Sequence, residues 1–302
     1  MKQQLENISN GFAQYFAEAG YAAQPPVAIT SGVDSSVTLI GSGISVLKPY
    51  LLTRPLEGPG VFIRQRAIRT HALKTICEQE EGRFASFFEA FCVLVPYACL
   101  GQLMENAMLF FNQVLEVPQS SVLFRISSGD RDLLEGAASL HMEPQIETDS
   151  REPAYYRHKY GLEEQKIRGR NLNFSFVHAG AADLDVGNVI VIERDGVPFA
   201  AEFALGCQTT AMGLYGIPYS IQANAVADIL PLDTTPRRKL ADALVVTAVM
   251  ENEKIHACRQ RYPVYLYRKY ARALEHWRSA LDIPEQQIQE WKKDYLLLDY
   301  TK

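Results

Sequence analysis

The chain has 302 residues, 47% of them hydrophobic and 22% charged, so it can bury one large core or two modest ones and is not a disordered chain. The formal net charge of -5 argues against a dedicated nucleic-acid binder. No apolar run approaches the ~20 residues that span a bilayer, and the N-terminus lacks the apolar core of a signal peptide. We therefore expect a cytoplasmic protein with no membrane partner.

The cysteines and histidines do not form a recognisable metal or disulfide pattern. The five cysteines are odd in number, widely spaced and without a CxxC pair, which excludes a disulfide framework and the usual zinc motifs. The six histidines are equally scattered, and each fits a surface or core position better than a metal site.

The first hundred residues mix one clear helix with β-like segments. Residues 4–19 place Leu5, Ile8, Phe12, Tyr15 and Phe16 on one helical face, and a glycine follows as a stop. Residues 36–40, 61–70 and 84–95 are predicted as strands, with a polar hairpin loop joining the last two. The stretch between the first two predicted strands is read as turns, marked by Gly41, Gly43, Pro49 and Pro55.

The second half begins with strands and ends with helices. Residues 98–116 have helical spacing, 122–126 form a strand, and 127–187 are too mixed to assign. The run NVIVIERDGVPFAAEFALG predicts a hairpin, because Asp195 and Gly196 suit the positive φ of a tight turn. After Pro236 only helices are predicted.

This order of elements predicts an α+β fold. We expect an antiparallel sheet with flanking helices in residues 1–230, followed by a small all-helical domain in residues 231–302.

Arg69 is the first candidate for chemistry. It is in phase with Val61, Ile63 and Ala67 on a largely apolar strand face, where a guanidinium requires an anionic partner. One reading is a structural ion pair with Glu89 across the hairpin; the other is a ligand for a phosphate or carboxylate. Arg83, at the far end of the loop, either closes over the same ligand or is a solvated loop residue.

Three phenylalanines lie directly after Arg83. Phe84 and Phe88 share one strand face and Phe87 takes the other. Aromatic residues on a strand are usually core residues, but an exposed ring also offers a flat surface for an adenine base.

Several stretches, in order, resemble the catalytic core of alanyl-tRNA synthetase, a class II synthetase. LENISNGFAQYFAEAGY is similar to its opening helix, and DSSVTLIGSGISVLKPYLL to its first motif, in which Lys48, Pro49 and Tyr50 match. AIRT and GRFASFFEA resemble the second motif, DVGNVIVIERD a following strand, and TTAMGLYGI the third motif. DALVVTAVMENEKIHACRQRYPVYLYRKYARALEHWRSAL is similar to the start of the family's helical tRNA-binding domain.

The resemblance implies adenylate formation, in which an acid attacks the α-phosphate of ATP and pyrophosphate leaves. Arg69 would hold the α-phosphate and the substrate carboxylate, Arg83 the β- or γ-phosphate, and Phe88 would stack on adenine. Magnesium would be required, with Asp185 as a ligand. The substrate pocket that the family implies comprises Glu89, Asn188, Val191, Thr209 and Ala211.

The chain also departs from the family pattern. Thr209 stands where the family has the aspartate that receives the substrate ammonium, and Tyr215 and Gly216 replace a Glu-Arg pair whose arginine packs on the nucleotide. Phe84 and Ala85 replace two histidines. Losing the carboxylate costs a charge-assisted bond worth ~2 to 3 kcal/mol, so we expect that free alanine is not the substrate. Losing the arginine at position 216 removes a similar contact to the nucleotide, so we expect that ATP binding is weak or lost. We also expect the family's editing and C-terminal domains to be absent.

Three functions are therefore carried forward. The first is a synthetase-like enzyme that activates or transfers a small amino or carboxylic acid onto a carrier or metabolite. The second is a transferase that uses an aminoacyl-tRNA as donor and no ATP. The third is an inactive paralogue with a binding or regulatory role. The helix at 263–281 is either a tRNA contact or a solvated basic face, with Arg268, Lys269, Arg272 and Arg278 against Glu275.

Overall fold

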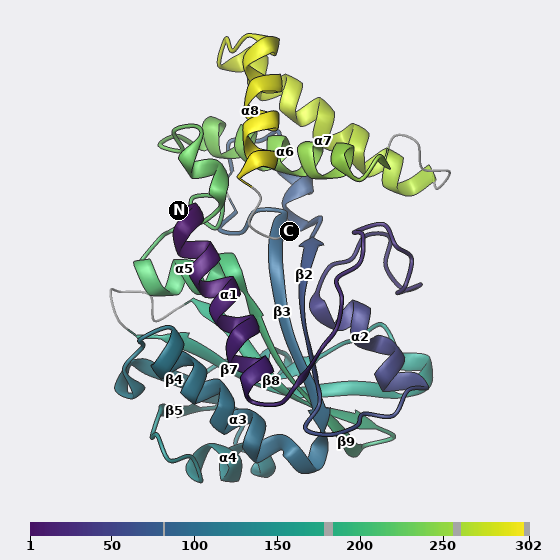
Figure 1. Ribbon diagram of the computed structural model, residues 1–302, viewed down its shortest axis with the longest axis vertical. Coiled ribbons are helices and arrows are strands. Elements are labelled where there is room, and N and C mark those ends of the chain that lie inside the picture. Colours follow the sequence, from purple (N-terminus) through teal and green to yellow (C-terminus); the bar gives the residue numbers. More distant parts are fainter. Residues whose placement is uncertain (81, 178–183, 256–260, 299–302) are drawn as a thin grey trace.

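The computed structural model describes residues 1–80, 82–177, 184–255 and 261–298 (Figure 1). Among these residues a nine-stranded sheet has the strand order β1-β2-β3-β9-β8-β7-β4-β5, with β6 paired to β7 beside that path. In chain order the strands are β1 Ala22–Ala23, β2 Val61–Ile68, β3 Phe87–Pro96, β4 Val122–Ile126, β5 Gln145–Thr148, β6 Arg157–His158, β7 Ile167–Phe176, β8 Asp185–Arg194 and β9 Val197–Gly206.

The sheet is mainly antiparallel. Only the short edge pairs β1–β2 and β4–β5 run parallel among the described strands. The helices are α1 Lys2–Glu18, α2 Gly43–Leu52, α3 Leu100–Leu109, α4 Arg131–Ala138, α5 Cys207–Tyr215, α6 Thr235–Asn252, α7 Arg261–Ala280 and α8 Glu285–Leu297. The predicted α+β fold, an antiparallel sheet with flanking helices and a helical C-terminal part, is confirmed.

Short helical turns connect the main elements. A π-helical turn, Phe110–Val114, continues α3, so the predicted helix over 98–116 is confirmed. The remaining turns are 3-10 helices at His71–Lys74, Tyr97–Cys99, Gln119–Ser121, Pro153–Tyr156, Glu163–Gln165 and Ala225–Asp228.

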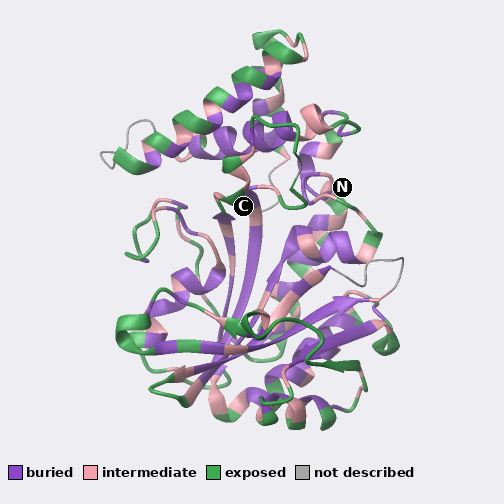
Figure 2. Cartoon of the chain, turned by 180° about the vertical axis from the view of Figure 1, so that it is seen from behind, coloured by how far each residue is buried: buried purple, intermediate pink, exposed green. Residues whose placement is uncertain are grey.

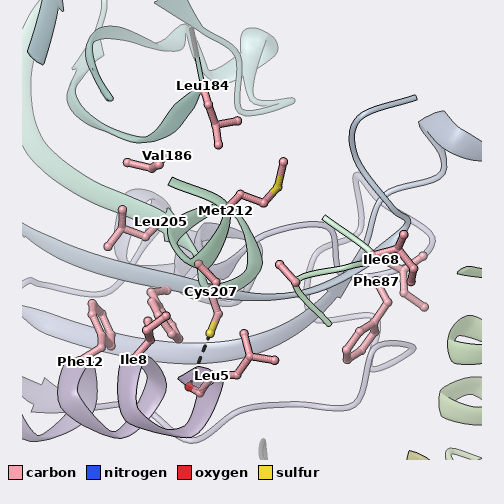
Figure 3. Close-up of a cluster of buried hydrophobic side chains, with 14 of the residues drawn as sticks. Leu5, Ile8, Phe12, Ile68, Phe87, Leu184, Val186, Leu205, Cys207 and Met212 are labelled. Atoms are coloured by element: carbon pink, nitrogen blue, oxygen red, sulfur yellow. Dashed lines mark hydrogen bonds between the residues drawn. The ribbon is translucent and has the colours of Figure 1, made fainter. Parts of the chain in front are cut away.

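Helices α1, α3 and α5 cover one face of the sheet. Apolar side chains of these helices join those of the strands in one large buried cluster. Figure 3 shows Leu5, Ile8 and Phe12 of α1 beside Cys207 and Met212 of α5. The Sγ of Cys207 lies 3.8 Å from the backbone oxygen of Leu5. Burial is nearly continuous along the central strand β3 (Figure 2), because its alternate side chains pack into apolar clusters on opposite faces of the sheet.

The opposite face of the sheet is covered only in part. Helix α2 packs on β2 and β3, and a second, smaller cluster joins Ile44, Leu47 and Leu51 of α2 to Ile63 and Leu94 of the strands. Beyond α2 this face carries polar residues of β7, β8 and β9. The fold therefore leaves half of one sheet face available for a site.

The C-terminal helices gather at one end of the molecule (Figure 1). Residues 239–250 of α6 are all buried and belong to the same apolar cluster as the sheet. In α7, the indole Nε1 of Trp277 donates to the backbone oxygen of Ile76 at 2.6 Å. The division at residue 230 stays a prediction. Among the described residues we find no helix with the length and apolar character to cross a bilayer.

Two local predictions were wrong. Residues 36–40 form no strand, and the segment read as turns contains α2, with Pro49 inside the helix. Proline removes one backbone donor and usually ends a helix, but here the apolar face of α2 packs on the sheet and outweighs that preference.

The hairpin β8–β9 is confirmed. Asp195 and Gly196 have φ values of 52° and 79°, the left-handed region that the turn requires. The unassigned stretch before it holds α4 and the strands β5, β6 and β7.

Candidate functional site

Two adjoining cavities lie over the half-covered face of the sheet. Cavity A has a volume of about 590 Å³ and runs between α2, the loop before it, and the segment that follows β6. Cavity B has a volume of about 410 Å³ and lies over β3, β7, β8 and β9. The residues that line both are Ser42, Arg69, Asn188, Glu202 and Ala204, so the two cavities form one site.

The floor of cavity B is a row of cross-strand partners. Asn173 of β7 pairs with Asn188 of β8, which pairs with Ala204 of β9. Because side chains alternate along a strand, these three point to the same side. Their neighbours one residue along the strands, including Val189 and Phe203, point into the opposite core.

Arg69 follows β2 directly and lines both cavities. Its Nε donates to the backbone oxygen of Gly41 at 3.1 Å, and its guanidinium carbon lies 5.0 Å from the centre of the Phe88 ring. Among the described residues it forms no ion pair, so the predicted structural pair with Glu89 is not formed. The side chain is exposed toward the cavity, yet the surrounding protein desolvates it and lowers its pKa. An arginine keeps its charge under such a shift, so Arg69 is a cation open to an anionic ligand.

Glu202 is a buried carboxylate in the same site. It is 2% exposed and accepts hydrogen bonds from the hydroxyl of Tyr160 at 2.9 Å and from the thiol of Cys92 at 3.3 Å. Burial raises its pKa to about 7, and the positive charge of Arg69 opposes that rise. The site thus contains a cation and a carboxyl group that titrates near neutral pH.

Of the other ionisable groups that line cavity A, Lys48 is paired and His158 is neutral, whereas Lys159 is exposed. Lys48 lies 2.7 Å from Asp34, and both side chains are buried. Burial and the charge of Arg69 lower the pKa of His158 to about 4, so its imidazole is neutral at pH 7. A ligand in cavity A therefore meets the positive charges of Arg69 and Lys159, and of these two Arg69 also lines cavity B.

Asp185, the predicted magnesium ligand, lines cavity B but is already engaged. Its Oδ1 accepts from Arg125 at 3.1 Å and from Ser175 at 3.1 Å, and its Oδ2 accepts from Tyr155 at 2.7 Å. Among the described residues no group of three or more metal-ligating side chains occurs. A carboxylate neutralised by an arginine does not fit a magnesium ligand, and no step below depends on one.

The predicted nucleotide residues are only partly brought together. Phe88 is half-buried and lines cavity B beside Arg69, and Phe84, 52% exposed, lines its edge. Arg83 does not line cavity B but a hollow of about 30 Å³, whose lining shares Phe84 with cavity B. Its backbone oxygen accepts from the amide of Ser220, so the chain at Arg83 is fixed although its side chain is exposed.

The predicted substrate residues divide between the two faces. Asn188 and Thr209 line cavity B. Glu89 and Val191 are 2% and 0% exposed and lie on the core face of β3 and β8, while Ala211 is buried in α5. Glu89 accepts from Ser9 of α1 at 2.9 Å. Glu89, Val191 and Ala211 line neither cavity, so their assignment to the substrate pocket is corrected.

Thr209 and Gly216, in the stretch that resembles the third motif, each have a local structural role. The hydroxyl of Thr209 donates to the backbone oxygen of Gly206 at 2.8 Å, one turn back, and provides no negative charge. Gly216 has φ of 65° and ends α5 in the left-handed conformation, which disfavours a side chain there. The helix thus ends at the position where the sequence resemblance predicts an arginine.

Sequence reasoning missed Glu202, Tyr160 and His158. The available signal was Glu202 itself, a single charge within the apolar run VPFAAEFALG. A buried charge requires partners, and these come from Cys92 and Tyr160, which are far from it in sequence. No local pattern predicts that meeting.

Sequence comparison finds similarity over part of the chain. No protein-family model matches. The alanine–tRNA ligase of Bacillus subtilis (strain 168) is 33% identical over 79 residues, which are 26% of this chain and 9% of that protein. The corresponding enzyme of Bacillus velezensis is 32% identical over 79 residues, again 9% of its length.

Structural comparison finds class II synthetases at low sequence identity. Asparaginyl-tRNA synthetase from Pyrococcus horikoshii, complexed with asparaginyl-adenylate, superposes with a TM-score of 0.44 and 10% identity, covering 73% of this chain and 66% of that one. Pyrrolysyl-tRNA synthetase from Desulfitobacterium hafniense gives 0.43 and 9%, covering 73% of each chain. The chain is thus similar, over 79 residues, to the alanine–tRNA ligases, and that stretch spans 9% of their length.

Proposed function

We propose that this protein binds an activated small carboxylic or amino acid, as an acyl-adenylate, in the joined cavities, and transfers it to a carrier or metabolite. The observation that carries the proposal is Arg69, a guanidinium open to both cavities and without an ion pair among the described residues. The 79-residue similarity to alanine–tRNA ligases supports the same reading.

Arg69 is suited to the charge that adenylate chemistry develops. The attacking carboxylate and the α-phosphate are both anions, and a guanidinium offers two parallel donors to either. A fixed donor at the phosphate stabilises the transition state more than an acid or base does. Gly41 accepts a hydrogen bond from Nε, which leaves the two terminal nitrogens of Arg69 to bind the ligand.

The aromatic rings beside Arg69 provide a surface for the base. Phe88 lies under the guanidinium and Phe84 is exposed at the edge of cavity B. A planar base can stack on such rings without specific hydrogen bonds. Because Gly216 ends α5, position 216 supplies no arginine over the base, and we expect magnesium-ATP to bind no tighter than the high micromolar range.

The acceptor is proposed from the surface of α7. Arg268, Lys269 and Arg272 are exposed on this helix, whereas Arg278 is held by Glu275 at 2.5 Å. Three exposed cations on one helix suit a phosphate-bearing acceptor, either a tRNA or a carrier with a phosphorylated arm. The basic face supports this partner class and no particular member of it.

The test is ATP–pyrophosphate exchange against a panel of amino and carboxylic acids. We expect exchange with at least one acid and the loss of that exchange in Arg69→Ala. Binding of ATP without exchange would instead support a regulatory paralogue. No nucleotide binding, together with transfer from an aminoacyl-tRNA, would support the ATP-independent transferase.

A further inference from the structure

Glu202 and Arg69 both line the two cavities, one with an acidic and the other with a basic side chain, and they form no ion pair with each other. Among the described residues neither forms an ion pair within 4.0 Å, although each influences the pKa of the other. Both line cavities A and B. A molecule that enters the site therefore meets a cation on one side and a carboxyl group on the other.

Two buried hydrogen-bond donors hold the carboxyl group of Glu202 in place. Tyr160 donates to Oε2 and Cys92 donates to Oε1, and both donors are fully buried or nearly so. Each oxygen has a second lone pair, so Glu202 can accept further hydrogen bonds from the cavity side. Two neutral donors do not balance a negative charge, which leaves room for a cationic partner.

We propose that Glu202 receives the ammonium group of the substrate, so that the acid bound by Arg69 is an amino acid. This inference rests on the proposed function and names its substrate class. The anionic end of the zwitterion faces Arg69, and the ammonium faces Glu202 instead of residue 209. Thr209 is then free of that role, which accounts for the absence of a carboxylate at that position.

The electrostatics of the site agree with this arrangement. The groups that act on Glu202 are Tyr160 after β6, Cys92 on β3 and Arg69 after β2, and the first two are uncharged at pH 7. His158, which also lines cavity A, is neutral there. Of the two lysines that line cavity A, Lys48 is paired with Asp34 and Lys159 is exposed. Because the pKa of Glu202 is about 7, part of the protein carries this carboxyl group protonated at pH 7, and binding of an ammonium group releases that proton.

The first experiment measures that proton. Calorimetric titration of the wild-type protein with each standard amino acid is repeated in buffers of different ionisation enthalpy at pH 7. An amino acid that binds should release about half a proton per ligand, because Glu202 is about half protonated there. Its desamino acid should release none and bind at least about 10-fold more weakly. This test requires no substitution, so it does not depend on a variant that folds.

The second experiment uses matched variants. Glu202→Gln should abolish both the proton release and the preference for the amino acid over its desamino acid. Glu105→Gln is the control, since Glu105 lies at a different cavity, where it pairs with His141. We expect this control to behave as the wild type.

The outcomes separate the inference from the proposed function. Desamino acids that bind as tightly as amino acids, a preference that survives in Glu202→Gln, or no amino-acid binding at millimolar concentration would each overturn the role of Glu202. Pyrophosphate exchange with desamino acids would support adenylate formation and still overturn the inference. Proton-coupled amino-acid binding without exchange would support Glu202 and count against the activating enzyme.

Discussion

Arg69 and Arg125 lie on the same face of the sheet and differ in what they contact. Arg125 is 3% exposed and bonds Glu147, Asp185 and Ser175, whereas Arg69 is open to the cavities and contacts Gly41 and Phe88. The first arginine therefore belongs to the fold and the second to the site. Which role an arginine takes depends on partners from distant strands.

This difference predicts opposite effects on stability. Arg125→Ala should lower the free energy of unfolding by about 2 to 3 kcal/mol, because it leaves Asp185 and Ser175 without their charged partner. Arg69→Ala should change it by less than about 1 kcal/mol, since one hydrogen bond and one ring contact are lost. Urea unfolding followed by circular dichroism measures both. An equal loss in the two variants would show that Arg69 is structural.

Glu202 makes the stability depend on pH in a definite direction. Its pKa is raised in the folded state, to about 7, so the folded protein binds more protons than the unfolded chain between about pH 4.5 and 7. The contribution of Glu202 to the free energy of unfolding is fully present below that window and is lost as the pH rises through 7. Glutamine does not titrate, so the Glu202→Gln variant does not lose this stability as the pH rises. Its free energy of unfolding, relative to that of wild type, should therefore increase by up to about 3 kcal/mol between about pH 4 and pH 8.

Unfolding of the two proteins in urea at both pH values gives this difference. Asp242, also buried with a raised pKa, contributes equally to both proteins and cancels. A difference between wild type and variant that does not change with pH would mean that Glu202 stays ionised in the fold.

At the scale of elements, the close approach of α2 to the sheet shapes the site. Gly43 opens α2 and lines cavity B, and a Cβ built there would lie 2.5 Å from the Cβ of Cys92. Both atoms are fixed to backbone, so the contact is relieved only if the helix moves. Cys92 also donates a hydrogen bond to Glu202, so the packing of α2 against Cys92 is linked to the site.

Gly43→Ala should therefore destabilise the protein by about 1 to 3 kcal/mol and weaken ligand binding together with it. Gly101→Ala is the matched control, because Gly101 is an exposed helical residue with nothing within 4 Å of a built Cβ. That control should be neutral or more stable by up to about 1 kcal/mol. Thermal denaturation compares the two, and a Gly43→Ala variant as stable as the control would contradict the close packing of α2.

The sequence predicted those elements whose signal is local. The hairpin β8–β9 depends on Asp195 and Gly196 in a two-residue turn, and the helix α1 on its apolar period; both are confirmed. Helix α2 was missed because Pro49 and two glycines are typical of turns, while its stability comes from packing on β2 and β3.

The same distinction applies to the site. Arg69, Asn188 and Thr209 were named in advance and line the cavities, since strand period and family resemblance locate them. Glu89 and Val191 were named too, but the pleat turns them to the core face. Glu202 acquires its role only through Tyr160 and Cys92, which the fold brings together from other segments.

At the scale of the whole molecule, the C-terminal helices are tied to the sheet through buried polar contacts. Asp242 of α6 accepts from the amide and hydroxyl of Ser86, and Tyr270 of α7 donates to the same hydroxyl. Lys239 donates to the backbone oxygen of Thr75. The contacts of Ser86 lie directly before β3, between Phe84 and Phe88, so the helices support the wall of cavity B.

We therefore predict one cooperative unfolding transition for the chain, although a boundary near residue 230 is predicted from sequence. The apolar cluster runs from the sheet into α6 without a break among the described residues. Calorimetry should give equal van't Hoff and calorimetric enthalpies. Two separable transitions, one assigned to residues 231–302, would show that the helices fold as an independent domain.

The central claim is that Arg69 binds the anionic group of an activated acid in the joined cavities. The most direct measurement is calorimetric titration with a non-hydrolysable aminoacyl-adenylate analogue, comparing wild type, Arg69→Ala and Arg54→Ala. Arg54 is the matched control because it is an exposed arginine over the ring of Tyr50 and lines neither cavity. We predict that wild type and Arg54→Ala bind alike and that Arg69→Ala loses about 30- to 150-fold in affinity. Equal binding by all three proteins, or no binding at millimolar analogue, would contradict the account.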